Sequence, residues 1–241
     1  MKSLIALFTA FAMLCPHSRA EEGPKPQLPA ARVSIFQVPM RCPAAPQIGC
    51  GSFAKPFLVE LTKNPIVREA WLNRAGTLLA VVSAETFSRE DRAKVVQAIS
   101  RNSNLDAKEL QGVEFESALA NFNSPTGWYK GSEVDKLSGE EANLIAQRLI
   151  RRIKVKVFLS ADKAAKLEPA IADVFKRQFM TDASKTNETS HSDCDQELVK
   201  VASVYLDEKT LAVFKEALKP GWRPIPEDKE PQSEGSCCTH P

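Results

Sequence analysis

Two cysteines in one loop constrain this chain more than any other feature. Cys42 and Cys50 follow a β-prone run at residues 33–38 and precede a helix-like segment rich in Phe and Leu. The prolines of the loop deny it a helix, because proline lacks an amide hydrogen and disfavours helical backbone in the residue before it. We therefore expect an extended loop between the first strand and the first helix, with thiols that solvent can reach.

The patterning that follows the loop predicts the rest of an α+β fold. Two further β-prone runs, residues 66–72 and 77–82, are joined by a glycine-containing turn that suits a hairpin. A second helix begins at a capping box formed by Ser88 and Asp91, and residues 110–115 read as a last short strand. The order β-α-β-β-α-β predicts a ferredoxin-like sandwich with its helices on one face of the sheet.

The opening of the cysteine loop, Met40-Arg41-Cys42, matches the first half of a Met-x-Cys-x-x-Cys motif. In this motif and in element order, residues 33–115 resemble the heavy-metal-associated domain of copper chaperones and mercury-binding periplasmic proteins. The resemblance implies a soft metal ion held by loop thiolates. If Cys42 is the first cysteine of the motif, the second follows only at Cys50, farther along the chain than in the family. Alternatively, Cys50 matches the first family cysteine, and Phe53 occupies the position of the second. In either alignment the short pair is absent, so the family's tight two-thiolate site does not transfer directly.

Cys42 and Cys50 allow two interpretations. As thiolates folded back onto one ion they suit Cu(I) or Hg(II), which accept linear coordination, whereas Zn(II) would need further ligands. Cys50 should carry more thiolate character, because the N-terminus of a helix lowers a thiol pKa. As a disulfide, the pair would staple the loop in an oxidising compartment. A reductant or a metal could open such a bond, which would make the pair a redox sensor.

The C-terminal tail carries a second group of soft or borderline ligands. Cys237, Cys238 and His240 lie within four positions, in a segment with almost no apolar residues. We expect a disordered tail whose ligands form a flexible accessory metal site; the alternative is a tail whose thiols have no role. Cys194 and His191 form another pair in a polar loop, and we interpret that pair as incidental.

The first 20 residues have the make-up of a secretory signal peptide. Lys2 gives a positive start, residues 4–14 form an apolar core, and Ser18-Arg19-Ala20 is a small-x-small cleavage site. We expect cleavage after Ala20 and a periplasmic or secreted protein. Cleavage removes two of the 32 basic residues and none of the 30 acidic ones, so the remaining chain has no net charge that would favour nucleic acid. No later stretch is apolar over the length of a membrane span.

The composition changes along the chain predict its division into segments. Beyond residue 137, Ser138 and Glu141 form a cap at the start of a helical pattern. Within it, we interpret Arg148, Arg151 and Arg152 as a solvated basic face. We interpret Glu140 and Glu141 as a solvated acidic pair. The starts Leu159-Ser-Ala-Asp-Lys163 and Leu206-Asp-Glu-Lys-Thr210 resemble, distantly, those of periplasmic metal and stress-response helical hairpins. The expected segments are a signal peptide (1–20), a flexible leader (21–32), a ferredoxin-like domain (33–120), a linker (121–137), a helical region (138–222) and a disordered tail (223–241).

Taken together, these patterns predict a non-enzymatic exported protein. The chain lacks a Gly-x-Ser-x-Gly elbow, a His-Glu-x-x-His helix, a phosphate-binding glycine loop and a Cys-x-x-Cys pair. The leading prediction is soft-metal binding or thiol redox sensing by the loop cysteines, with the helical half as a surface for a partner protein. The alternative is a structural or protein-interaction module whose loop is stapled by a disulfide.

Overall fold

The computed structural model describes residues 28–84, 87–124, 126–180 and 189–228, with the side chains of residues 189–191 excepted. Several predicted features lie outside the described residues: the signal peptide, most of the leader, and residues 229–241 with Cys237, Cys238 and His240. The side chain of His191 also lies outside them. Within the described residues, none of the helices combines the length and apolarity needed to cross a membrane.

The described part of the chain contains an antiparallel sheet of five strands in the order β4-β1-β3-β2-β5. The strands are β1 (Val33–Gln37), β2 (Val67–Asn73), β3 (Leu78–Ser83), β4 (Lys108–Glu109) and β5 (Trp128–Lys130). Central strands β1 and β3 pair from Val33 opposite Val82 to Gln37 opposite Leu78. Both are largely buried on their two faces, as expected of central strands that carry apolar residues on both faces.

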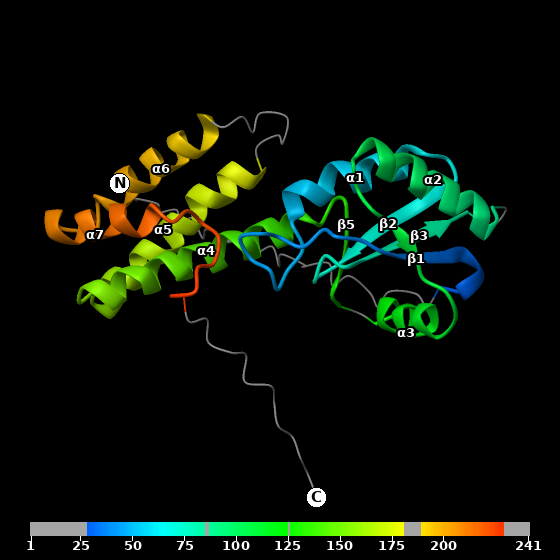
Figure 1. The fold of residues 1–241 in the computed structure, drawn as a ribbon, viewed down its shortest axis with the longest axis horizontal. Helices are drawn as coiled ribbons and strands as arrows, with labels where there is room; N and C mark the ends of the chain where they lie inside the picture. The colour runs from blue at the N-terminus through cyan, green and yellow to red at the C-terminus, as the bar shows by residue number, and fades with distance from the viewer. Residues whose placement is uncertain (1–27, 85–86, 125, 181–188, 229–241) are drawn as a thin grey trace, which may run out of the picture.

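Helices cover both faces of this sheet (Figure 1). Helices α1 (Gly51–Lys63) and α2 (Arg89–Asn102) pack on one face, and α2 begins at the predicted Ser88–Asp91 capping box. Helix α3 (Gly112–Phe122) packs on the other face. Its Phe122 is fully buried and lies edge-on between Trp71 and Trp128, with ring centroids 5.9 and 5.0 Å away.

A second core lies in a bundle of four helices at the other end of the molecule (Figure 1). The helices are α4 (Asp135–Lys156), α5 (Ala161–Met180), α6 (Thr189–Ala202) and α7 (Glu208–Leu218). Helix α4 belongs to both halves: its first turn packs against α1, and its later turns pack against α5 and α7. This long helix therefore carries side chains from the sheet into the bundle.

The predicted fold, a ferredoxin-like βαββαβ sandwich followed by a helical region and a disordered tail, is wrong. Residues 110–115 do not form a strand; β4 ends at Glu109, and α3 begins at Gly112 and covers the face of the sheet that was expected to be bare. The expected linker supplies a fifth strand, β5, at the edge beside β2. A short apolar run is compatible with both a helix and a strand, so the length of the run and the residues around it decide which of the two forms.

The predicted tail and the predicted basic face also need correction. The side chain of Asp228 is only 3% exposed and pairs with Arg152, so the first residues of the expected tail are packed. Arg148 and Arg152 are buried inside the bundle instead of lying on a solvated face. Buried arginines are tolerated where each donor finds an acceptor, and here the acceptors are backbone carbonyls and the Asp228 carboxylate.

Candidate metal and thiol site

The cysteine loop is closed by its own backbone hydrogen bonds, and this closure brings together two cysteines that are eight positions apart. The amide of Cys42 donates to the carbonyl of Ile48 at 2.9 Å, and the amide of Cys50 donates to the carbonyl of Met40 at 2.8 Å. Arg41 and Gly49 form an isolated antiparallel bridge between these bonds. The loop is thus a small hairpin, with Cys42 and Cys50 on opposite arms near its base.

Two glycine contacts hold this hairpin in place. Gly76, at φ +67°, lies so close to the loop that an added Cβ would sit 2.5 Å from the carbonyl oxygen of Met40. Gly51, directly after Cys50, packs against the start of α4, where a Cβ would lie 2.7 Å from the carbonyl oxygen of Val134. The second contact seats the N-terminus of α1 against α4 and places Cys50 beside that helix.

Glu141 of α4 completes the cluster. The sulfur atoms of Cys42 and Cys50 and a carboxylate oxygen of Glu141 all lie within 4.8 Å of one another. Cys42 is 1% exposed and Glu141 is 5% exposed, whereas Cys50 is half-buried. The prediction that Glu141 lies on a solvated helix surface is therefore wrong. The available signal was its spacing: Glu141 lies four residues before Ile145, on the stripe that faces the core.

The three groups shift one another's proton affinities. The Cys42 thiol donates to the Cys50 sulfur, and together with the Ser52 hydroxyl and helix amides it lowers the pKa of Cys50 to about 6. The same hydrogen bond and burial raise the pKa of Cys42 far above its usual range. Burial raises the pKa of Glu141 to about 7, although the Cys42 thiol opposes this shift. One thiolate is therefore stable at neutral pH, whereas further negative charge in the cluster is disfavoured.

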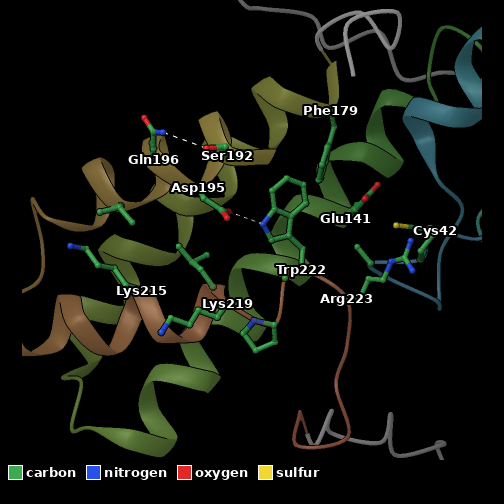
Figure 2. Close-up of a pocket in the computed structure, with 16 residues that line it drawn as sticks. Cys42, Glu141, Phe179, Ser192, Asp195, Gln196, Lys215, Lys219, Trp222 and Arg223 are labelled. Atoms are coloured by element: carbon green, nitrogen blue, oxygen red, sulfur yellow. Dashed lines mark hydrogen bonds between the residues drawn. The ribbon is translucent and has the colours of Figure 1, made fainter. Parts of the chain in front are cut away.

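A cavity of about 1050 Å³ opens beside the cluster (Figure 2). Cys42 and Glu141 lie at one end of it, and the aromatic rings of Phe179 and Trp222 form a wall. The indole nitrogen of Trp222 donates to a carboxylate oxygen of Asp195 at 3.3 Å, which holds the ring in place. The cluster can therefore be reached from a space large enough for a chain segment or a small molecule.

The third cysteine within the described residues, Cys194, does not belong to this cluster. Cys194 is 2% exposed within the bundle core, where burial raises the pKa of its thiol to about 12. The prediction that Cys194 lies in a polar loop is wrong, because Cys194 belongs to α6 and packs into the bundle core. Cys237, Cys238 and His240 fall outside the described residues. None of the three cysteines within them forms a disulfide.

Comparisons of the chain with protein-family models, with curated proteins and with solved structures found no match in any of the three. The resemblance to heavy-metal-associated domains therefore stays a prediction that rests on the residues of the loop.

Proposed function

We propose that this protein binds a thiophilic metal ion through Cys42, Cys50 and Glu141. The observation that carries the proposal is the approach of the three ligand atoms to within 4.8 Å of one another. Ligand atoms about 2.0–2.3 Å from one tetrahedral Zn(II) ion lie about 3.3–3.8 Å apart, which falls inside this limit. We also propose that the protein is exported, as its first 20 residues predict, and that it binds the metal outside the cytoplasm.

The polarity of the cluster supports a cation there. Glu141 Oε2 is buried and has no hydrogen-bond partner among the described residues. An unpartnered buried carboxylate oxygen is costly, and a metal ion would satisfy it directly. A bound cation would also stabilise the second thiolate and the carboxylate, which the metal-free cluster disfavours because it is largely buried.

The carboxylate distinguishes among the ions predicted from the sequence. Cu(I) and Hg(II) are satisfied by two thiolates, whereas Zn(II) accepts a carboxylate as a further ligand. We therefore expect Glu141→Gln to lower Zn(II) affinity by more than about tenfold, since even an outer-shell partner is worth about 10–100-fold. The same substitution should leave Cu(I) or Hg(II) affinity nearly unchanged.

Competition with a chromophoric chelator, on reduced protein purified without oxygen, tests this proposal. Cys50→Ser should abolish tight binding of all three ions, whereas Cys194→Ala, which removes a thiol from the bundle core, should abolish none. Stoichiometric binding that survives Cys50→Ser, or no binding by the unaltered protein, would reject the Cys42–Cys50–Glu141 site.

Thiol redox chemistry is a second candidate, which the hydrogen bond from Cys42 to Cys50 favours. The Cys50 thiolate would attack a disulfide of a partner and release one thiolate from it. Cys42, after passing its proton to the Glu141 carboxylate, would then attack the Cys50 sulfur and release the second thiolate. The protein loses two electrons, which the partner's disulfide gains, and forms a Cys42–Cys50 bond. Glu141→Gln should slow the second step but not the first, as rapid mixing with oxidised glutathione would show.

A further inference from the structure

The cavity beside the cluster has two chemically different ends. Figure 2 shows Cys42 and Glu141 on one side of Trp222, and Lys215 and Lys219 on the other. The volume of the cavity, about 1050 Å³, is at the upper end of the range for small-molecule sites in proteins. The cavity therefore has room for an organic molecule that contacts the cluster and the aromatic wall together.

The aromatic wall is built before any ligand arrives. The ring centroid of Trp222 lies 5.0 Å from that of Phe175 and 6.3 Å from that of Phe179, and the indole nitrogen donates to Asp195. These contacts fix the orientation of the indole ring, so little conformational freedom is lost when a ligand packs against it. A preformed aromatic wall favours a ligand with a ring.

Positive charge along the cavity favours an anionic ligand. Three exposed cations line it: Lys215, Lys219 and Arg223. Lys219 pairs with Glu216 at 2.7 Å, whereas the side chains of Lys215 and Arg223 form no ion pair within the residues that the structure describes. An anion that enters the cavity therefore meets cations whose charge is not already offset by a carboxylate.

Arg223 places one of these cations beside the cluster. Figure 2 shows its side chain directed toward Cys42, at the end of the cavity that Glu141 also lines. The backbone carbonyl of Arg223 accepts a hydrogen bond of 2.9 Å from the buried Arg152, which anchors the base of an otherwise exposed side chain. A guanidinium binds a carboxylate through two parallel hydrogen bonds. The cluster end of the cavity can therefore recognise a carboxylate.

The proposed metal ion has an incomplete set of protein ligands at this end of the cavity. The described residues offer three ligands, whereas Zn(II) takes four. Cys42 and Glu141 line the cavity, so an ion that they hold borders the same space. A thiophilic ion favours sulfur in the remaining position. Two thiolates and one carboxylate already outweigh the charge of a divalent ion, so a further thiolate needs a cation nearby, and Arg223 supplies one.

We propose that the cavity binds an aromatic organic thiol that carries a carboxylate. Its sulfur takes the fourth position on the ion held by Cys42, Cys50 and Glu141. Its carboxylate pairs with Arg223, and its ring packs against Trp222. The thiol gives up its proton on binding, because a metal is bound by the thiolate. This inference rests on the proposed metal site.

Thiosalicylate, which has a ring, a carboxylate and a thiol, is the probe for the test, and Co(II) replaces Zn(II) as the ion. Charge-transfer absorption from sulfur to Co(II) grows with each thiolate bound. Thiosalicylate added to the reduced, Co(II)-loaded full chain should raise this absorption by the equivalent of one thiolate, and ultrafiltration should show that the Co(II) remains with the protein. Thiophenol lacks the carboxylate and should need a concentration about tenfold higher for the same increase.

One variant isolates the carboxylate contact. Arg223→Met should raise the dissociation constant of thiosalicylate about tenfold and leave that of thiophenol unchanged. Lys200→Met is the matched control, because it removes an exposed cation of α6 that does not line the cavity, and it should change neither constant. Salicylate, which has the ring and the carboxylate but no thiol, should compete with thiosalicylate without adding sulfur absorption.

The outcomes separate the two proposals. If the chain binds Co(II) but thiosalicylate adds no absorption, removes the ion or binds no more tightly than thiophenol, the ligand site is overturned and the three-residue metal site is left intact. An unchanged dissociation constant for thiosalicylate in Arg223→Met would overturn the ligand site in the same way. Failure of the full chain to bind Co(II) would overturn both.

Discussion

Arg148 Nη1 donates a hydrogen bond of 2.6 Å to the carbonyl oxygen of Ala44, two residues after Cys42. Arg148 lies two helical turns after Glu141 on α4. The same helix thus supplies Glu141 and the donor that holds the cysteine loop against it. We therefore expect this contact to help keep Cys42 close to Glu141, although neither residue takes part in it.

Arg148→Met should therefore weaken the site as well as the fold. The change leaves the carbonyls of Ala44 and Trp222 without this donor, and we expect a loss of about 2–3 kcal/mol in the free energy of unfolding. Zn(II) affinity should fall with it. Lys154→Met, at an exposed position of the same helix, is the control for loss of a positive charge. Unchanged metal affinity in folded Arg148→Met protein would contradict this positioning role.

Gly51 should be intolerant of any side chain. Gly51→Ala places a Cβ 2.7 Å from the carbonyl oxygen of Val134, so α1 has to move away from α4 and carry Cys50 away from Glu141. We expect lower thermal stability and weaker Zn(II) binding. Gly139→Ala in α4, where an added Cβ meets nothing within 4 Å, should instead stabilise the protein by about 0.5–1 kcal/mol. Similar melting temperatures for the two variants would contradict the close packing of α1 on α4.

Cys50 should be the reactive thiol of the metal-free, reduced protein. Its pKa of about 6 makes it mostly thiolate at pH 7, whereas Cys42 is buried and has a raised pKa. Limiting iodoacetamide should modify Cys50 first, at a rate that rises through pH 6 and then levels off. Cys42→Ser should shift that rise to a different pH, because the thiol donor is replaced. Peptide mapping that finds Cys42 modified first would contradict the assignment.

Glu141 should make the stability of the metal-free protein depend on pH. The pKa of Glu141 is about 7 in the folded state and about 4.3 in an unfolded chain. Between these values the unfolded state releases the proton first, so this group lowers stability as pH rises through that window. The effect is complete above about pH 7 and amounts to about 4 kcal/mol. Urea unfolding of Glu141→Gln and of the unaltered protein should diverge by this amount; a constant difference across pH 4–8 would contradict the burial of an ionisable carboxyl.

Phe122 tests the second covered face of the sheet. Phe122→Ala should cost about 3–5 kcal/mol, because it empties the space between Trp71 and Trp128. Tryptophan fluorescence should report the change directly. Val113→Ala, on the same helix at 82% exposure, should stay within about 0.5 kcal/mol. A mild effect of Phe122→Ala would mean that α3 does not cover the sheet.

Local sequence signals determined the elements on which the site is built. The β-prone runs that form β1 and β3 and the capping box at Ser88 each act over a few residues, and the structure has them where the patterns indicate. The cysteine loop between β1 and α1 was predicted in the same way. These features depend on backbone preference and on near neighbours, which a sequence carries explicitly.

Only the tertiary structure decided which residues lie beside the cysteine loop. Nothing local shows that Glu141 meets Cys42 and Cys50, that Asp228 pairs with Arg152, or that residues 112–122 form a helix over a second face of the sheet. Charged residues in a helix read as solvated until their neighbours are known, because burial is a property of the packed molecule. The chemistry of this site depends on contacts between segments far apart in the chain, and packing around α4 supplies them.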